Sequence, residues 1–314
     1  MPALDGGLSC DWLAPFRVGI ALTLAVHRRG PGDPTFRVDA SGALWRTSLT
    51  PAGPATLRLT SSDGGRGQPG TYIQATAWGE GARWILARVP DLVGAKDDPA
   101  AFRPDHPRLR ELVRQHPGLR VGRTDRVLEA VVPAVLEQKV LGVEAHRAWR
   151  SLLRRHGLPA PGPAPAGMRV FPPAATWRAI PSWDWHRAGV EAVRARTIAG
   201  AAAVAGRLEA TAGMAGAEAD RLLQSLPGIG PWTAAEVRQR ACGDADAVSV
   251  GDYHLPSFVS WVLAGEPDAD DERMLELLAS YPGQRYRVTR LIELGGGGPP
   301  RRGPRLALRD YRAF

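Results

Sequence analysis

The sequence of 314 residues predicts an α+β fold in which an antiparallel, β-rich N-terminal part precedes an all-α part. Two observations carry this prediction. Up to about residue 100, short runs rich in β-branched and aromatic residues alternate with turns rich in glycine and proline. From Arg108 onward, apolar residues recur at helical spacing. The length suffices for two domains with cores of their own.

We place the domain boundary in the polar, proline-rich segment between Asp97 and Pro107. The chain then divides into a β-rich (α+β) domain, 1–103, a helical domain, 104–294, and a tail, 295–314. The tail begins with four consecutive glycines and contains five arginines. We expect it to be flexible and to add non-specific affinity for polyanions.

The N-terminal part contains the runs 17–27, 42–49, 55–60, 72–78 and 82–87, which favour strands. Gly79-Glu80-Gly81 lies between the last two runs and predicts a hairpin turn. We expect these strands to form one antiparallel sheet, accompanied by a helix or two. Trp45, Trp78 and Trp84 are expected to pack in the core or on a face of the sheet.

The helical part begins with a short amphipathic segment around 109–113. Residues 125–140 follow with a strong helical pattern, and Pro133 inside it should kink the helix or mark its buried side. Helices are also predicted at 217–226, 233–240 and 271–281.

Charge and cysteine content limit the function. The net charge of +8 fits a polyanionic partner, nucleic acid first. Cys10 and Cys242 are the only cysteines, so a disulfide framework and a four-thiolate iron–sulfur cluster are excluded. The seven histidines show no tight ligand spacing, and we therefore expect no catalytic metal.

The N-terminal residues lack a basic region followed by an apolar run. The longest apolar stretch, 20–26, is too short to span a bilayer. We expect a cytoplasmic protein, associated with the nucleoid, that makes no membrane contact.

Residues 226–235 are the most informative stretch, reading Leu-Pro-Gly-Ile-Gly-Pro-Trp-Thr-Ala-Ala. Gly228 and Gly230 allow a tight turn between two helices, and Pro231 suits the first position of the second helix. The free N–H groups near Trp232 and Thr233 would form an anion site at the start of that helix. The alternative is a helix–helix turn without a ligand.

This string resembles the helix-hairpin-helix of base-excision DNA glycosylases. Gly251-Asp252-Tyr253 follows about twenty residues after the hairpin, where that superfamily carries its catalytic aspartate. Residues 135–140, Val-Leu-Glu-Gln-Lys-Val, are similar to the family's Ile-Leu-x-Gln-Gln-Val segment. Together these motifs resemble the 3-methyladenine DNA glycosylase II branch. The similarity is loose over most of the chain and more specific at 125–140 and 217–254.

The resemblance implies a role for nine residues. Asp252 would be the catalytic carboxylate, the alternative being a side chain that only caps the following helix. Trp232, Tyr253 and Glu236 would line the base pocket, although Glu236, standing where relatives often have an aromatic residue, could also face solvent. The predicted DNA-binding residues are Gly228, Gly230, Thr233, Gln138 and Lys139.

The segment containing Gln138 and Lys139 wedges into DNA in the family. Lys139 departs from the usual apolar or amide wedge, so it could contact a phosphate or the orphaned base. The alternative for both residues is a solvated polar helix end. Gly295 falls near a position that can carry tryptophan in the family, which leaves the range of lesions open.

The resemblance implies a monofunctional glycosylase that extrudes an alkylated, cationic purine such as 3-methyladenine and hydrolyses its N-glycosidic bond. Bifunctional relatives carry a lysine at the position of Trp232 and form a Schiff base, which tryptophan cannot do. An indole face would attract a cationic base. One alternative is a non-catalytic damaged-DNA-binding protein. Another is a β-lyase, for which Lys139 is the only lysine in the helical part.

The implied partner is double-stranded DNA containing damaged bases, bound by a monomer. We expect no cofactor. The resemblance allows a structural monovalent cation held by the hairpin carbonyls, with no catalytic metal.

Overall fold

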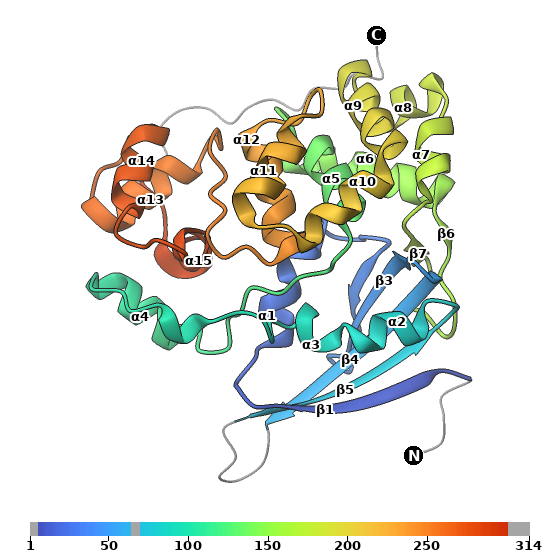
Figure 1. Ribbon diagram of the computed structural model, residues 1–314, viewed down its shortest axis with the longest axis horizontal. Helices are drawn as coiled ribbons and strands as arrows, with labels where there is room; N and C mark the ends of the chain where they lie inside the picture. Colours follow the sequence, from blue (N-terminus) through green and yellow to red (C-terminus); the bar gives the residue numbers. More distant parts are fainter. Residues whose placement is uncertain (1–5, 64–69, 301–314) are drawn as a thin grey trace.

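A computed structural model describes residues 6–63 and 70–300. The N-terminal part forms one five-stranded antiparallel sheet, and the rest of the described chain is mostly helical (Figure 1). The predicted α+β class is therefore confirmed. A second, two-stranded sheet joins the short strands β6 (Leu158–Pro159) and β7 (Arg169–Val170).

The large sheet has the order β1-β5-β4-β3-β2, so β1 and β2 are its edges. Its strands are β1 (Leu8–Ala14), β2 (Phe36–Val38), β3 (Leu44–Thr50), β4 (Gly53–Asp63) and β5 (Thr71–Trp78). The central register pairs Leu57 with Ala77 and Leu59 with Ala75, which places apolar residues opposite each other on the buried face. The runs 42–49, 55–60 and 72–78 are confirmed as strands, whereas the two edge strands, β1 and β2, were missed.

Two of the predicted strands are helices. Residues 17–27 contain α1 (Ile20–Leu24) and the 3-10 turn η1 (Ala25–His27), and residues 82–87 form α2 (Ala82–Ala87). In both, the buried residues lie three or four apart, as with Ala82 and Ile85. The prediction weighed β-branched composition above this spacing. The hairpin expected at residues 79–81 is consequently a strand-to-helix turn.

The helices before the hairpin are α3 (Val89–Leu92), η2 (Pro99–Ala101), α4 (Pro107–Gln115), α5 (Val127–Leu136), α6 (Gly142–His156), α7 (Ala174–Ala179), α8 (Ser182–Ala188), α9 (Ala192–Ala203), α10 (Ala205–Glu209), η3 (Ala210–Gly213) and α11 (Gly216–Gln224). After it come α12 (Pro231–Val237), η4 (Arg238–Cys242), α13 (Leu255–Ala264), α14 (Asp271–Leu278), α15 (Arg285–Leu291) and η5 (Ile292–Gly296). No helix in the described ranges has the length and apolar character needed to traverse a bilayer.

Three main apolar cores hold these elements. One lies under the sheet with α1 and α2, a second is built around α5, and a third joins α4 to α13, α14 and α15. Trp177 and Trp185 are buried in the second core, whereas Trp183 is exposed. The domain boundaries at 103/104 and 294/295 stay predictions.

The start of the predicted tail is packed against α4. Helix η5 runs through Gly296, and the Gly295 carbonyl accepts a hydrogen bond of 2.6 Å from Arg108 Nη2. A Cβ atom at Gly295 would lie 2.9 Å from Leu112 Cδ2, so a larger residue would not fit here without a shift. Residues 301–314, with the five arginines of the predicted tail, lie outside the described residues.

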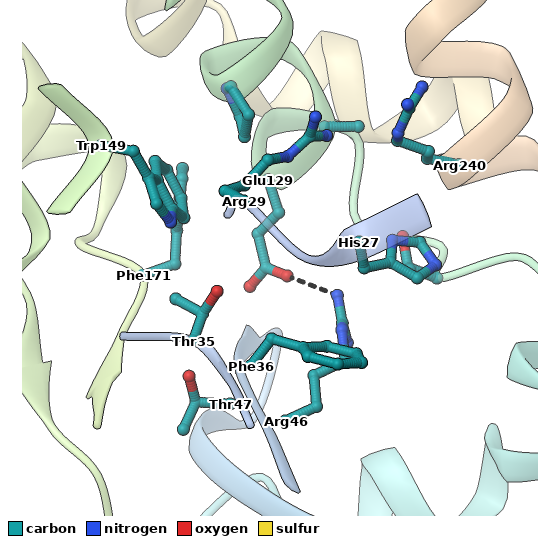
Figure 2. A pocket seen from close by; sticks show the side chains of 13 residues that line it. His27, Arg29, Thr35, Phe36, Arg46, Thr47, Glu129, Trp149, Phe171 and Arg240 are labelled. Carbon is teal, nitrogen blue, oxygen red and sulfur yellow. Dashed lines mark hydrogen bonds and ion pairs between the residues drawn. The ribbon is translucent and has the colours of Figure 1, made fainter. Parts of the chain in front are cut away.

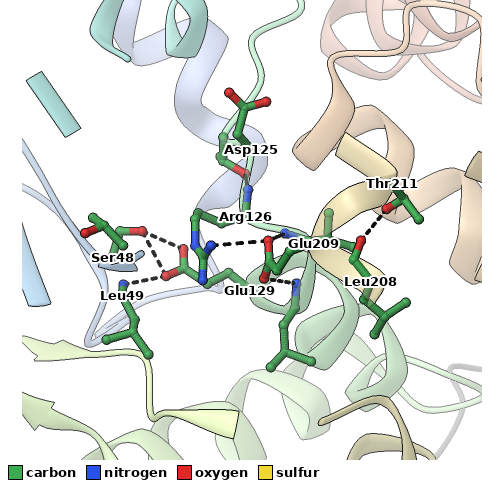
Figure 3. A network of polar contacts seen from close by, with 12 residues as sticks. Ser48, Leu49, Asp125, Arg126, Glu129, Leu208, Glu209 and Thr211 are labelled. Atoms are coloured by element: carbon green, nitrogen blue, oxygen red, sulfur yellow. Dashed lines mark hydrogen bonds and ion pairs between the residues drawn. The ribbon is translucent and has the colours of Figure 1, made fainter. Parts of the chain in front are cut away.

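Glu129 of α5 fixes the sheet to the helical part. Its carboxylate accepts hydrogen bonds from Ser48 Oγ and Leu49 N of β3 at 2.6–3.0 Å (Figure 3). It also accepts one from Arg46 Nη2 of β3 at 3.2 Å. The side chains of Arg46 and Glu129 are each 9% exposed. Removing one of them would leave the other charge buried without its partner, at a cost of about 3–5 kcal/mol. These hydrogen bonds and the Arg46–Glu129 ion pair hold the N-terminal sheet against α5.

Candidate active site

The predicted hairpin connects α11 to α12, and its two glycines have different environments. Gly228 has a φ of +86°, and a Cβ atom there would lie 2.1 Å from Thr197 Oγ1 of α9. Glycine is required at this position on both counts. Gly230 has a φ of −100°, and a Cβ atom there would meet nothing within 4 Å. The space beside Gly230 is therefore open.

Gln138 ties the segment after α5 to this hairpin. Its Nε2 donates to the Gly228 carbonyl at 2.9 Å and to Thr233 Oγ1 at 2.8 Å. Thr233 is buried and its hydroxyl accepts the hydrogen bond from Gln138, so the Thr233 side chain does not face solvent. Lys139 follows as an exposed residue with a φ of +54°. This left-handed conformation places Lys139 at the tip of a loop that Gln138 anchors.

Asp252 is held by a set of hydrogen bonds to both of its carboxylate oxygens. Oδ1 accepts from the backbone N–H groups of His254 and Leu255, at 2.8 and 3.0 Å, at the start of α13. Oδ2 accepts from the indole Nε1 of Trp232 at 3.1 Å. The preceding Gly251 donates its N–H to Asp271, which fixes the loop. One oxygen of Asp252 thus binds backbone N–H groups at the start of α13, while its other oxygen binds Trp232, so the side chain does more than hold the start of that helix.

A pocket of about 440 Å³ lies beside the hairpin and contains Asp252. It is formed by the segment from η1 to Arg29, the end of α5, α12, η4, the Asp252 loop, α15 and η5. Its lining residues are Ala25, Val26, Arg28, Arg29, Glu137, Trp232, Glu236, Gln239, Arg240, Ser249, Asp252, Leu255, Tyr286, Thr289, Arg290 and Glu293. The volume is in the range of small-molecule sites.

The carboxylates of this pocket differ in their partners. Three of them are paired with arginines: Glu137 with Arg29 at 2.8 Å, Glu236 with Arg240 at 2.7 Å, and Glu293 with Arg290 at 3.1 Å. Among the residues that the structure describes, no lysine or arginine lies within 4.0 Å of the Asp252 carboxylate. Asp252 is therefore the one carboxylate of this pocket lining without an arginine partner in the described part of the chain.

Burial and these ion pairs shift several pKa values. Burial raises the pKa of Glu137, but Arg29, together with His146 and Arg240, outweighs it and lowers this pKa to about 2. Burial raises the pKa of Tyr286 to about 12. The Glu137 carboxylate is thus ionised and the Tyr286 phenol protonated at neutral pH.

The structure brings Trp232, Glu236 and Asp252 together in this pocket. Glu236 does not simply face solvent, because its other oxygen accepts a hydrogen bond from Ser249 Oγ at 2.7 Å. The predicted position of Tyr253 in the base pocket is wrong. Tyr253 is absent from the pocket lining, it is 82% exposed, and its ring contacts His254. Because Asp252 turns inward to cap α13, its neighbour points away from the pocket.

Sequence reasoning missed the contribution of the N-terminal part. Arg29 and Arg240 line both the large pocket and a smaller cavity of about 30 Å³ behind it. Figure 2 shows this cavity, with Glu129 and Arg46 joined across it and His27 at one side. Burial and the nearby arginines 46, 240 and 29 lower the pKa of His27 well below its usual value. The cavity is polar and large enough for a water molecule.

No group of three or more His, Cys, Asp or Glu residues that could hold a metal ion occurs in residues 6–63 and 70–300.

No family model matches the chain. Over 151 residues, or 48% of the chain, it is 35% identical to proteins from two strains of Mycobacterium tuberculosis, CDC 1551 and H37Rv. Both are described as a "probable bifunctional transcriptional activator/DNA repair enzyme AlkA". The matched region spans 30% of those relatives' length.

Two solved structures share the fold over nearly the whole chain. A 3-methyladenine DNA glycosylase from Archaeoglobus fulgidus matches with a TM-score of 0.75 and 18% identity, over 90% of this chain and 97% of its own. An 8-oxoguanine glycosylase/lyase from Clostridium acetobutylicum, in complex with double-stranded DNA containing 8-oxoguanine, matches with a TM-score of 0.65 and 11% identity, over 92% and 96%. The predicted resemblance is therefore confirmed at the level of the fold: this chain has the fold of the helix-hairpin-helix DNA glycosylases, and its sequence is similar to the AlkA relatives over 48% of its length.

Proposed function

We propose that this protein is a monofunctional DNA glycosylase. It would bind duplex DNA that contains an alkylated purine, extrude the damaged nucleotide and hydrolyse its N-glycosidic bond. The single observation that carries the proposal is Asp252, a carboxylate without a cationic partner among the described residues, in a pocket beside a glycine hairpin.

The chemistry of bond breaking favours such a carboxylate. As the base departs, positive charge develops on the sugar around C1′. A carboxylate about 4 Å away stabilises a unit positive charge by about 4 kcal/mol at an effective dielectric constant of 20. This corresponds to about a thousandfold in rate. Asp252 can also orient the attacking water, because its Oδ2 retains a lone pair beyond the Trp232 bond.

The hairpin would hold the DNA backbone while the nucleotide is extruded. The N–H groups of Trp232 and Thr233 lie in the first turn of α12 and have no acceptor within that helix. The open space at Gly230 lets a phosphate approach this end of α12, where Trp232 is partly exposed. Gln138 fixes Lys139 next to the hairpin, where it would contact the DNA at the extruded nucleotide.

A monovalent cation at the hairpin carbonyls stays a prediction. The hairpin carbonyls have room for such an ion in their bonding. The Leu226 carbonyl accepts one hydrogen bond from Ile229 N, and the Gly228 carbonyl accepts one from Gln138 Nε2. Because a carbonyl oxygen has two lone pairs, each retains one that could bind a cation. Such an ion would supply positive charge at the phosphate.

The pocket supports hydrolysis without strand cleavage. Its lining contains no lysine. Lys139 is exposed on the neighbouring loop, and Lys96 is paired with Asp91 at 2.8 Å. A Schiff-base mechanism needs an amine within reach of C1′.

A base-release assay on duplexes carrying alkylated, deaminated or oxidised bases tests the proposal, with borohydride trapping beside it. We expect free alkylated purine, an intact abasic strand and no trapped protein. Lesion-dependent binding without base release would show a non-catalytic binder of damaged DNA. A borohydride-trapped covalent complex that disappears in Lys139→Gln would show a β-lyase.

Trp232→Phe should slow base release by about tenfold or more. The substitution keeps an aromatic face but removes the N–H that orients Asp252, and a hydrogen bond to a charged group contributes about 1.5–3 kcal/mol. The single-turnover rate on methylated duplex measures the effect, with Trp183→Phe, an exposed indole on α8, as the matched control. An unchanged rate would show that the indole N–H has no part in positioning Asp252.

A further inference from the structure

Arg28, which follows the 3-10 turn η1, is an exposed arginine of the pocket lining. Arg29, Arg240 and Arg290 also line the pocket, and each forms an ion pair with a glutamate. Within residues 6–63 and 70–300, by contrast, the guanidinium of Arg28 takes part in no ion pair and no hydrogen bond. The N-terminal part of the chain therefore brings an uncompensated positive charge to the place where the pocket opens to solvent.

The backbone on both sides of Arg28 is fixed to the helical part. The Val26 carbonyl accepts a hydrogen bond from Arg240 Nε at 3.1 Å, and Arg29 is paired with Glu137 at 2.8 Å. The side chains of Arg240 and Arg29 are only 14% and 8% exposed, so both contacts are shielded from water. Arg28 can therefore bind a partner at the pocket without a shift of the chain around it.

The Arg29–Glu137 ion pair also connects Arg28 to the loop that is predicted to contact DNA. Glu137 comes two residues before Lys139, which is exposed at the tip of that loop. Arg28 and Lys139 are thus exposed cations on two segments that one ion pair holds together. This places a cation of the N-terminal part beside the segment that would meet the DNA.

The chemistry of an extruded nucleotide indicates what Arg28 would bind. With the sugar at Asp252, the phosphates on either side of that sugar lie at the opening of the pocket. The Asp252 carboxylate repels these anions, and a guanidinium nearby offsets the repulsion. Arginine also binds phosphate oxygens through two parallel N–H groups. A cationic base would instead be repelled by Arg28, so the phosphate is the better partner.

We propose that Arg28 binds a phosphate that flanks the extruded nucleotide, and that the N-terminal part thereby contributes directly to DNA binding. The inference rests on the proposed function, because it needs a nucleotide that has left the duplex for the pocket. A contact with the DNA backbone carries no information about the base, so it serves every lesion that the pocket admits.

Arg28→Met tests the inference on a duplex with tetrahydrofuran in place of one nucleoside, which has both flanking phosphates and no base. We expect the affinity at low salt to fall by about tenfold or more. The slope of log K against log salt concentration should become shallower by about 1, because one phosphate contact is lost. Arg28→Lys keeps the charge and should keep the slope. Arg83→Met, an exposed arginine of α2 outside the pocket lining, is the matched control and should equal the wild type in affinity and slope.

Three outcomes would overturn the role of Arg28. They are an unchanged affinity and slope in Arg28→Met, an equal loss on an undamaged duplex of the same sequence, and a lower free energy of unfolding in this variant, which would show a structural part. Because these measurements concern binding, they are separate from base release. Wild-type protein that binds the tetrahydrofuran duplex but releases no base from any lesion would contradict the proposed function and leave the Arg28 contact standing.

Discussion

Asp252→Asn should bind methylated duplex DNA as tightly as the wild-type protein and release its base about a thousandfold more slowly. The amide oxygen can still accept from His254 N and Leu255 N, so α13 keeps its cap. The negative charge opposite the developing cation is lost, which removes about 4 kcal/mol of transition-state stabilisation at an effective dielectric constant of 20. Single-turnover rates and binding isotherms on one duplex measure both quantities.

Asp268→Asn is the control for this substitution. Asp268 is exposed on the loop between α13 and α14 and lies outside the pocket lining. Its variant should match the wild type in rate and in affinity. Turnover by Asp252→Asn at the wild-type rate would refute the assignment of Asp252.

The second large effect is expected for Gly228→Ala. The new Cβ atom would clash with Thr197 Oγ1 and would occupy a φ of +86°, which L-residues rarely adopt. We expect a loss of about 2 kcal/mol or more in the free energy of unfolding. Because Gln138 binds the Gly228 carbonyl, the Lys139 loop should move as well, and DNA affinity should fall. Denaturant unfolding and DNA-binding isotherms measure these changes.

Gly230→Ala tests the role of the hairpin in DNA binding without a change in protein stability. Its φ of −100° suits alanine, and the new methyl group meets nothing within the protein, so stability should be unchanged. DNA affinity should still fall if the backbone of DNA occupies that space. Wild-type affinity in Gly230→Ala, or wild-type stability in Gly228→Ala, would contradict the proposed role of the hairpin.

The parts of this fold that were predictable carry local signals. The hairpin is marked by two glycines and a proline within a few residues, and β3, β4 and β5 by β-branched runs between turns. Helices α1 and α2 were predicted to be strands because short apolar runs fit the spacing of a strand as well as that of a helix. Their apolar residues pack against the sheet, a contact that the sequence alone does not show.

The parts of the site that were missed depend on long-range packing. Arg29 and Arg290 line the same pocket although the chain between them is most of the protein, and no local pattern marks either residue. Gln138 and Thr233 were predicted to bind DNA, and their hydrogen bond to each other was not predicted. The sequence does not show whether a polar side chain binds another side chain or a ligand. Tyr253 was misplaced because adjacent residues share a motif without sharing a direction.

The proposed role of the carboxylate at position 252 is to stabilise positive charge on the sugar. The most direct test compares the affinities of two duplexes, one with a cationic pyrrolidine analogue of the abasic sugar and one with neutral tetrahydrofuran. The wild-type protein should bind the cationic analogue about a hundredfold or more tightly, and Asp252→Asn should lose that preference. Equal affinity of the wild-type protein for the two duplexes would contradict the account.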